Sequence, residues 1–399
     1  MNARTDSGER LHALDHLRAA MMWLGIVLHV AAIHTVMESP LPWHDRQTTP
    51  WADLLAVVIH SFRMPVFFIV AGFFVAMLVR DRGLRGMLAN RLQRLGLVFV
   101  LLWPPLYLAC GVLALLFLHR MARGTWGIDE TLMPVTGEHP KINTMHLWFI
   151  WMLWWFSLLT ALLAPLSAYV DAPVRHWLSS SFQQLASSRW GVLLLAVPLA
   201  LVGAFCKNGV VMASGEFLPP LTEWLYNGLF FVFGLALFAH RDALLALYRQ
   251  RWPSNAALGL LLFVALFALT TMEKAHPGTI PNFLFWLALF YGLCTWLWSL
   301  ALIGFFLRYL GRQNAVLGYL AQSAYWVYLI HLPATIGFGA LLYDQHLAAG
   351  VKMLLNIGAS TVFSLLTYHL LVRSTLLGSL LNSRRYPFAS YGLGRRALT

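Results

Sequence analysis

Charged residues are scarce in this chain, and their scarcity excludes an ordinary soluble domain. Only 11% of the 399 residues are charged, whereas 59% are hydrophobic; soluble domains carry about a quarter of charged residues. The three cysteines, Cys110, Cys206 and Cys294, are scattered and form neither a disulfide framework nor a metal-binding spacing. The net charge of +12 does not indicate a nucleic-acid partner, because the basic residues lie at alternate ends of apolar segments.

Ten apolar segments approach the roughly 20 residues that a membrane-spanning helix needs. The first begins near Leu17 and contains Arg18, so we do not expect a cleavable signal peptide. We predict an all-α, polytopic integral membrane protein with a transmembrane domain over 1–375 and a basic cytoplasmic tail over 376–399. The ten predicted spans are 16–37, 54–79, 95–119, 146–170, 190–206, 221–239, 255–272, 282–307, 315–343 and 351–372. The fifth of these is short for a crossing.

The distribution of lysine and arginine predicts the orientation. With the N-terminus in the cytoplasm, most of the 28 basic residues fall in inner segments, and only a few, including Lys207 and Lys352, fall outside. Because cytoplasmic loops are enriched in Lys and Arg, and because the bias repeats from loop to loop, we expect both termini in the cytoplasm.

Carboxylates are missing from the interiors of the predicted spans. Asp15, Asp53 and Glu223 all lie at span ends. Cation-coupled transporters usually need an intramembrane Asp or Glu. The polar residues inside these spans are Arg, His and Tyr instead, which favours chemistry on an anionic donor over cation-coupled transport.

The first span carries an arginine and a histidine on one helix face. Arg18 and His29 are eleven residues apart, which in an α-helix restores the azimuth and separates them by about 16 Å. Asp15 lies three residues before Arg18 and can pair with it. A snorkelling arginine and a histidine bonded to a neighbouring helix would explain the same pattern.

The second span contains a histidine and an arginine beside a proline. His60 and Arg63 precede Pro65, which frees a backbone carbonyl and bends a helix. Gly72, further along the span, permits close approach of another helix. Pro65 and Gly72 have a structural explanation, but an Arg and a His in this position predict a site.

Three further groups complete the set of candidate residues. Arg91 and Arg94 follow an inner loop, where they indicate either topology and headgroup contact or phosphate recognition. His146 and Trp148 start the fourth span, where Trp is common as an interfacial anchor. The ninth span places three polar-tipped rings on one face, which a hydrogen-bonded stripe between helices would also explain: Tyr325, Tyr328 and His331.

These motifs, taken in order, resemble the membrane acyltransferase-3 family. The matching elements are Arg18-x10-His29, the stretch Phe62 to Phe73, Arg91-x-x-Arg94, His146-Leu147-Trp148 and Tyr328-Leu329-x-His331-x-Pro333. The resemblance runs from about residue 12 to 335. The His60–Pro65 version and the size are similar to the glucan biosynthesis protein C group, whose members succinylate osmoregulated periplasmic glucans. Ala71 departs from the pattern, since many members carry Ser there.

The resemblance implies an enzyme of the bacterial inner membrane that moves an acyl group, such as succinyl, from cytoplasmic acyl-coenzyme A to a periplasmic glycan hydroxyl. No permanently bound cofactor is implied. By this resemblance His29, Arg18 and Asp15 are catalytic, and Arg91, Arg94 and Arg18 bind the coenzyme A phosphates. The acceptor side would be lined by His60, Arg63, His146, Trp148, Tyr328 and His331. Two alternatives stay open: a transporter or flippase of a glycan or acyl donor, and an acyltransferase for a lipid or another small molecule.

Overall fold

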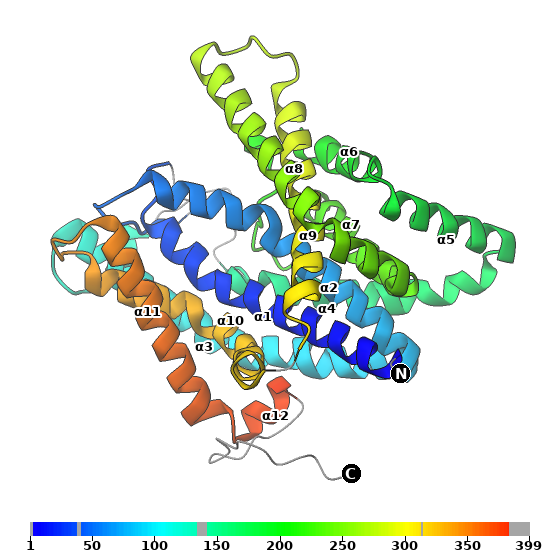
Figure 1. Ribbon diagram of the computed structural model, residues 1–399. Helices are drawn as coiled ribbons and strands as arrows, with labels where there is room; N and C mark the ends of the chain where they lie inside the picture. The colour runs from blue at the N-terminus through cyan, green and yellow to red at the C-terminus, as the bar shows by residue number, and fades with distance from the viewer. Residues whose placement is uncertain (1–2, 38–40, 134–141, 313, 383–399) are drawn as a thin grey trace. The chain divides into compact units, whose positions relative to one another are not determined.

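The computed structural model describes residues 3–37, 41–133, 142–312 and 314–382, with side-chain detail from residue 11 onward. All regular secondary structure in these ranges is helical, which confirms the predicted all-α class. The α-helices are α1 (Ala3–Ile33), α2 (Pro50–Arg91), α3 (Leu97–Arg123), α4 (Trp148–Leu163), α5 (Ala172–Ser187), α6 (Gly191–Gly203), α7 (Leu221–Ala239), α8 (Arg241–Ala275), α9 (Phe283–Tyr309), α10 (Ala315–Leu342), α11 (Ala349–Thr367) and α12 (Leu376–Asn382) (Figure 1).

Short 3-10 and π segments connect or extend these helices. Two of them, η1 (Leu92–Gly96) and η6 (Tyr368–Val372), are π-helices that continue α2 and α11. The 3-10 segments are η2 (Glu130–Leu132), η3 (Met145–Leu147), η4 (Ala164–Tyr169) and η5 (Lys207–Gly209).

Eight of the described helical runs are long and apolar enough to cross a membrane, or nine if the bent pair α5–α6 is one span. One run, Pro50–Arg123, has 74 residues and would measure about 110 Å as a straight helix, against a hydrocarbon core of about 30 Å. It contains both the second and the third predicted span, and Gly83 interrupts it with a φ of 68°. The ten predicted segments therefore all correspond to helices, and the chain is a multi-pass membrane protein.

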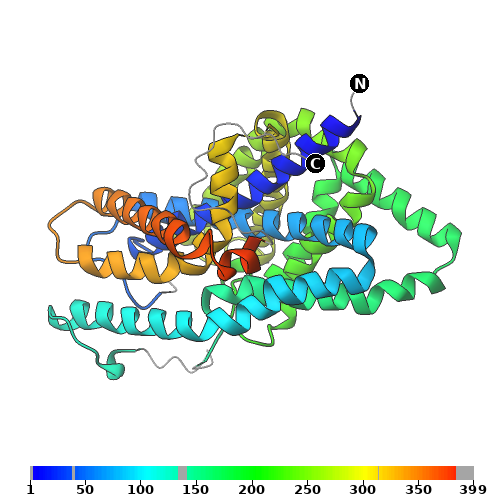
Figure 2. The same ribbon diagram turned by 90° about the horizontal axis from the view of Figure 1, so that it is seen from below.

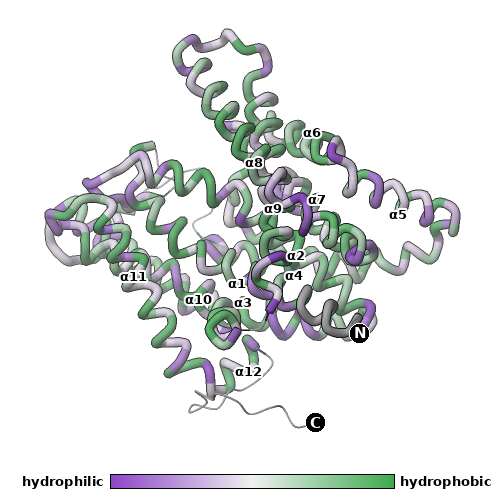
Figure 3. Tube along the Cα trace, viewed as in Figure 1, coloured by the Kyte–Doolittle hydropathy of each residue, from purple (hydrophilic) through white to green (hydrophobic). Residues whose placement is uncertain are grey.

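The fifth predicted span differs from the expectation. A straight crossing over 190–206 is not present, because α6 has only 13 residues, about 20 Å of helix. It reaches spanning length only together with α5, which was not predicted and which meets it at a bend of 98°. Hydropathy does not identify α5 as a span, because its residues are largely hydrophilic or neutral (Figure 3).

The chain folds as two compact units, which are described here separately. Unit 1 comprises 1–21, 57–96 and 136–317, and unit 2 comprises 22–56, 97–135 and 318–399. Both α1 and α2 begin in one unit and end in the other. Unit 1 therefore holds α4 to α9, and unit 2 holds α3, α11 and most of α10.

Within unit 1, α2 and α7 cross in close contact at two glycines. A Cβ on Gly72 would lie 2.1 Å from the Phe231 carbonyl oxygen, and a Cβ on Gly234 would lie 2.0 Å from that of Ile69. These distances are far inside van der Waals contact, so the crossing needs glycine on both helices. The role predicted for Gly72 is thereby confirmed.

The surface of α8 is that of a lipid-facing helix. Only 11% of its most apolar 18-residue stretch is buried. The exposed side chains include Leu258, Leu260, Leu261, Val264 and Phe267. In water such a surface would be unfavourable, whereas hydrocarbon solvates it. Figure 3 shows the corresponding concentration of hydrophobic residues along α8.

In unit 2, α10 and α11 run side by side (Figure 2), and Asn356 Nδ2 donates to the Thr335 carbonyl 3.0 Å away. Lys352, expected outside as a loop charge, instead lies in α11 with 1% of its surface exposed. Its Nζ donates to both oxygens of Asp45 at 2.9 Å and to the Tyr343 carbonyl at 2.8 Å. The buried ion pair fixes the α1–α2 connection to α11.

A second contact in that connection orders its first residue. His34, just beyond α1, is 2% exposed, and its Nδ1 donates to the Gln47 carbonyl at 2.8 Å. Burial lowers the pKa of His34 despite the opposing effect of that bond and of nearby Asp45. The connection is therefore held by contacts at both its beginning and its middle. Of the predicted tail over 376–399, only α12 lies inside the described residues.

Candidate functional site

The C-terminal half of α1 brings His29 beside a histidine of α10. The imidazole centroids of His29 and His331 are 5.1 Å apart with ring planes inclined by 45°. His331 is 1% exposed, and its Nδ1 lies 2.6 Å from the Tyr328 carbonyl oxygen. Both rings belong to unit 2. Two residues assigned to different roles by sequence, the general base and an acceptor-binding group, are therefore neighbours.

The aromatic stripe predicted on α10 is present. The ring centroids of Tyr325 and Tyr328 are 6.4 Å apart, and those of Tyr328 and His331 are 6.0 Å apart. Tyr328 is 2% exposed. The stripe thus runs along a buried face of α10 and ends at the imidazole pair.

The N-terminal half of α1 carries the predicted Asp15–Arg18 pair. Arg18 Nη2 and Asp15 Oδ1 are 3.1 Å apart, with side chains 38% and 40% exposed. The Arg18 guanidinium also lies over the Phe74 ring, 5.8 Å from its centroid. An ion pair this exposed contributes at most about 1 kcal/mol to stability, so Arg18 can exchange Asp15 for an anionic ligand at little cost. Because α1 is continuous, Arg18 and His29 lie on one helix as predicted.

Arg63 is buried, and its Nε is bound to the backbone of α1. Its Nε donates to the Met21 carbonyl at 2.9 Å, and its guanidinium lies 5.9 Å from the centroid of Phe67. Only 6% of Arg63 is exposed. The arginine ties α2 to the middle of α1 within unit 1, a function that its sequence position did not reveal.

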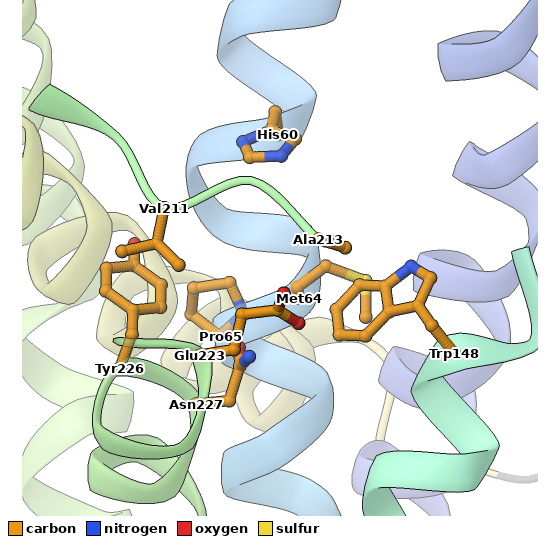
Figure 4. Close-up of a pocket in the computed structure, with 9 residues that line it drawn as sticks. All are labelled: His60, Met64, Pro65, Trp148, Val211, Ala213, Glu223, Tyr226 and Asn227. Atoms are coloured by element: carbon orange, nitrogen blue, oxygen red, sulfur yellow. The ribbon is translucent and has the colours of Figure 1, made fainter. Parts of the chain in front are cut away.

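His60, one turn before Arg63, borders a small hollow in unit 1 (Figure 4). Its Nδ1 lies 3.0 Å from the Tyr291 hydroxyl. The hollow encloses about 330 Å³ of atom-free space including open solvent, but only about 20 Å³ admits the centre of a water molecule, which is room for one or two waters. Its lining consists of His60, Met64, Pro65, Trp148, Val211, Ala213, Glu223, Tyr226 and Asn227.

Glu223 is the residue of this hollow that sequence reasoning missed. It is 2% exposed and accepts a hydrogen bond from the Ser214 amide at 2.6 Å. In Figure 4 its carboxylate points into the hollow between Tyr226 and Trp148. The spacing Glu223-x-x-Tyr226-Asn227 on one helix face was the available signal, but placing Glu223 at a span end hid it.

Trp148 lines the same hollow as His60, whereas His146 is not one of its lining residues. His146 and Trp148 both lie at the start of the fourth predicted span, where η3 (Met145–Leu147) leads into α4. His146 is 7% exposed. Trp148 packs against Phe68 with ring centroids 6.2 Å apart. Of the residues predicted to line an acceptor site, His60 and Trp148 are thus brought together in unit 1, while Tyr328 and His331 lie in unit 2.

Arg91 and Arg94 occupy the junction between α2 and η1. Arg91 is the last residue of α2, and Arg94 lies in the π-helical turn Leu92–Gly96. Both are half-buried. π-helical turns within α-helices are rare. Those that occur are often found at functional sites, because the wider turn redirects side chains. The turn coincides with the motif predicted to bind phosphate. Across the described residues, no three His, Cys, Asp or Glu side chains are grouped to hold a metal ion.

Comparison with known proteins identifies the family of the chain. The profile of the acyltransferase-3 family, described as an acyltransferase domain, matches residues 11–372. The chain therefore belongs to this family and is a membrane acyltransferase.

Several curated relatives share one name. The chain is 24% identical over 390 residues to the glucans biosynthesis protein C of Shigella dysenteriae serotype 1 and, equally, to that of Escherichia coli O139:H28. Each alignment covers 94% of this chain and 95% of the relative. No solved structure matches the chain.

Proposed function

We propose that this protein transfers an acyl group, succinyl in the first instance, from cytoplasmic acyl-coenzyme A to a hydroxyl of a periplasmic glucan, across the bacterial inner membrane. The observation that carries the proposal is the position of His29. It lies on α1, the helix that also bears Arg18, and its ring is held beside that of His331 on α10. The name of the relatives, glucans biosynthesis protein C, supports a glucan acceptor.

The donor half of the proposal rests on arginine. Coenzyme A is multiply anionic, and guanidinium groups form charge-assisted hydrogen bonds to phosphate. Arg91 directly precedes the π-helical turn η1 and Arg94 lies within it. Arg18 is partly exposed, and its ion pair with Asp15 is weak enough to be released. These three residues would bind the phosphates of the donor.

The chemical step needs one base and one leaving group. His29 accepts the proton of the acceptor hydroxyl as a general base. The hydroxyl oxygen attacks the thioester carbonyl carbon, an ester C–O bond forms, and the C–S bond breaks. The coenzyme A thiolate leaves and takes up the proton that His29 holds, which restores the neutral imidazole.

The acceptor half rests on the hollow around His60. Its carboxylate, amide, imidazole and phenol groups are hydrogen-bonding partners for sugar hydroxyls, and Trp148 offers an apolar ring face. Glu223 favours an uncharged hydroxylated acceptor over an anionic one. A sugar ring needs more space than the present hollow, so Met64 or Trp148 would have to move when the acceptor binds.

The decisive experiment measures free thiol released from succinyl-coenzyme A by the purified protein, with and without a neutral glucan oligosaccharide, and detects the succinylated product by mass spectrometry. The wild type is expected to release thiol in step with product. His29→Ala is expected to lose about 10²–10⁴-fold in rate while keeping its Tm. Full activity of His29→Ala would remove His29 from the mechanism; glucan moving across vesicles without thiol release would identify a transporter instead.

A further inference from the structure

The bonding of His331 fixes which of its nitrogens can accept a proton or a hydrogen bond. A backbone carbonyl only accepts hydrogen bonds, so the 2.6 Å contact with the Tyr328 oxygen requires the proton on Nδ1 of His331. In the neutral ring the lone pair then lies on Nε2. Because Nδ1 is turned to the backbone of its own helix, Nε2 lies on the opposite edge of the ring, away from α10.

The neighbour of this ring is His29. The centroid distance of 5.1 Å is that of rings in contact, and His331 is almost fully buried. Near these rings along the two helices, Ile26 and Val30 on α1 pack in one buried cluster with Val327 on α10. This packing holds α1 and α10 against each other within unit 2.

We propose that His331 is the positioning residue of His29, an inference that rests on the proposed function. A histidine base must present a lone pair to the hydroxyl and its other nitrogen to an acceptor, which fixes the tautomer. His331, with its proton held on Nδ1, would supply that acceptor through Nε2 once the substrates are bound. The arrangement has the logic of a Ser-His-Asp triad, in which the third group orients the base, with a neutral imidazole in place of the carboxylate.

A neutral orienting group suits this environment better than a carboxylate would. An ionised carboxylate inside a membrane protein needs a counter-charge or several hydrogen-bond donors. The predicted spans carry no carboxylate in their interiors. An imidazole that is already bonded to its own helix needs no counter-ion. This explains how the protein orients a base inside the membrane without an intramembrane Asp or Glu.

The purely structural alternative is that His331 only caps the Tyr328 carbonyl. Two substitutions separate the roles, because Asn places its amide nitrogen near the position of Nδ1, whereas Gln extends to the position of Nε2. His331→Asn keeps the donor to Tyr328 and loses the group that faces away from α10. His331→Gln reverses this. Thr335→Val is the matched control, since Thr335 Oγ1 makes the same kind of bond, to the Leu332 carbonyl at 2.9 Å.

The test measures kcat and KM for succinyl-coenzyme A with a neutral glucan oligosaccharide as acceptor. His331→Asn is expected to lose about 10²-fold in kcat, the effect of a misplaced catalytic group, with KM nearly unchanged. His331→Gln should retain more kcat than His331→Asn, and Thr335→Val should match the wild type. Near-wild-type kcat in His331→Asn, or the reverse order of the two variants, would overturn the proposal.

A double-mutant cycle with His29→Ala distinguishes this inference from the proposed function. If His331 acts through His29, adding His331→Asn to His29→Ala causes no further loss of the residual rate; a full additional loss overturns the inference. Should His331→Asn fail to accumulate as folded protein, the same cycle is run with His331→Gln. If His29→Ala alone is fully active, it is the proposed mechanism that has failed, since the cycle then has no base to position.

Discussion

At the scale of single residues, the molecule contains two kinds of ion pair with different energetics. Arg18 and Asp15 are about two-fifths exposed, so their pairing is weak and reversible. Lys352 and Asp45 are each 1% exposed, and neither charge can be left alone in that environment. The first pair is suited to ligand exchange and the second to permanent attachment.

Breaking the buried pair is therefore expected to be costly. Lys352→Met leaves Asp45 buried without its counter-charge, and we expect a loss of about 3–5 kcal/mol of stability, measured as a lower Tm in detergent. The control is Asp81→Asn, which removes an exposed partner of Arg80 and should change stability by less than about 1 kcal/mol. Equal effects of the two substitutions would show that the Asp45 carboxylate finds another partner.

Residue patterns predict which side chains lie on the same helix better than they predict contacts between helices. The eleven-residue spacing of Arg18 and His29 follows from helix geometry alone, and the structure keeps both on α1. The pairing of His29 with His331 depends on how helices 300 residues apart pack, which no local pattern encodes. The same holds for the contacts of Arg63 with a backbone carbonyl of α1 and of Glu223 with a loop amide, which no local pattern encodes.

At the scale of helices, the α2–α7 crossing depends on glycine at both contact points. Because a Cβ at Gly72 would lie 2.1 Å from a backbone oxygen, no side-chain rotation can relieve the overlap. Gly72→Ala is expected to cost about 1–3 kcal/mol, the usual range for overpacking, measured by thermal unfolding. Gly111→Ala is the control, since a Cβ there meets nothing within 4 Å and helix propensity favours alanine. A Gly72→Ala protein as stable as Gly111→Ala would mean that the two helices separate without penalty.

Helix existence was predictable because hydropathy reports it directly, whereas helix shape was not. Gly83 and Arg94 lie between the second and third predicted spans, where the sequence predicts a loop, whereas the structure has helix there with a break at Gly83 and a π-helical turn at Arg94. The bend between α5 and α6 divides an amphipathic helix from an apolar one, and hydropathy detects only the second. Turns of this kind arise from tertiary contacts such as the bond from Arg251 to the Ser187 carbonyl at 2.6 Å.

At the scale of the whole molecule, α6 determines on which side of the membrane the second half of the chain lies. The positive-inside pattern holds after Lys207 only if α6 crosses the membrane. We expect a topology reporter fused after Arg189 to be cytoplasmic, one fused after Asn208 to be periplasmic, and one at the C-terminus to be cytoplasmic. Reporters after Arg189 and Asn208 on the same side would make α5–α6 a re-entrant hairpin and would reverse the orientation predicted for the C-terminus.

The length of α8 has a consequence for the lipids around the protein. Its 35 residues make a rod of about 52 Å, some 20 Å more than the hydrocarbon core, while its apolar surface is confined to the part beyond Pro253. Arg249 and Arg251 consequently reach the headgroup layer, where anionic phospholipids attract such cations. Bilayers poor in phosphatidylglycerol or cardiolipin would hold this end of the helix less firmly.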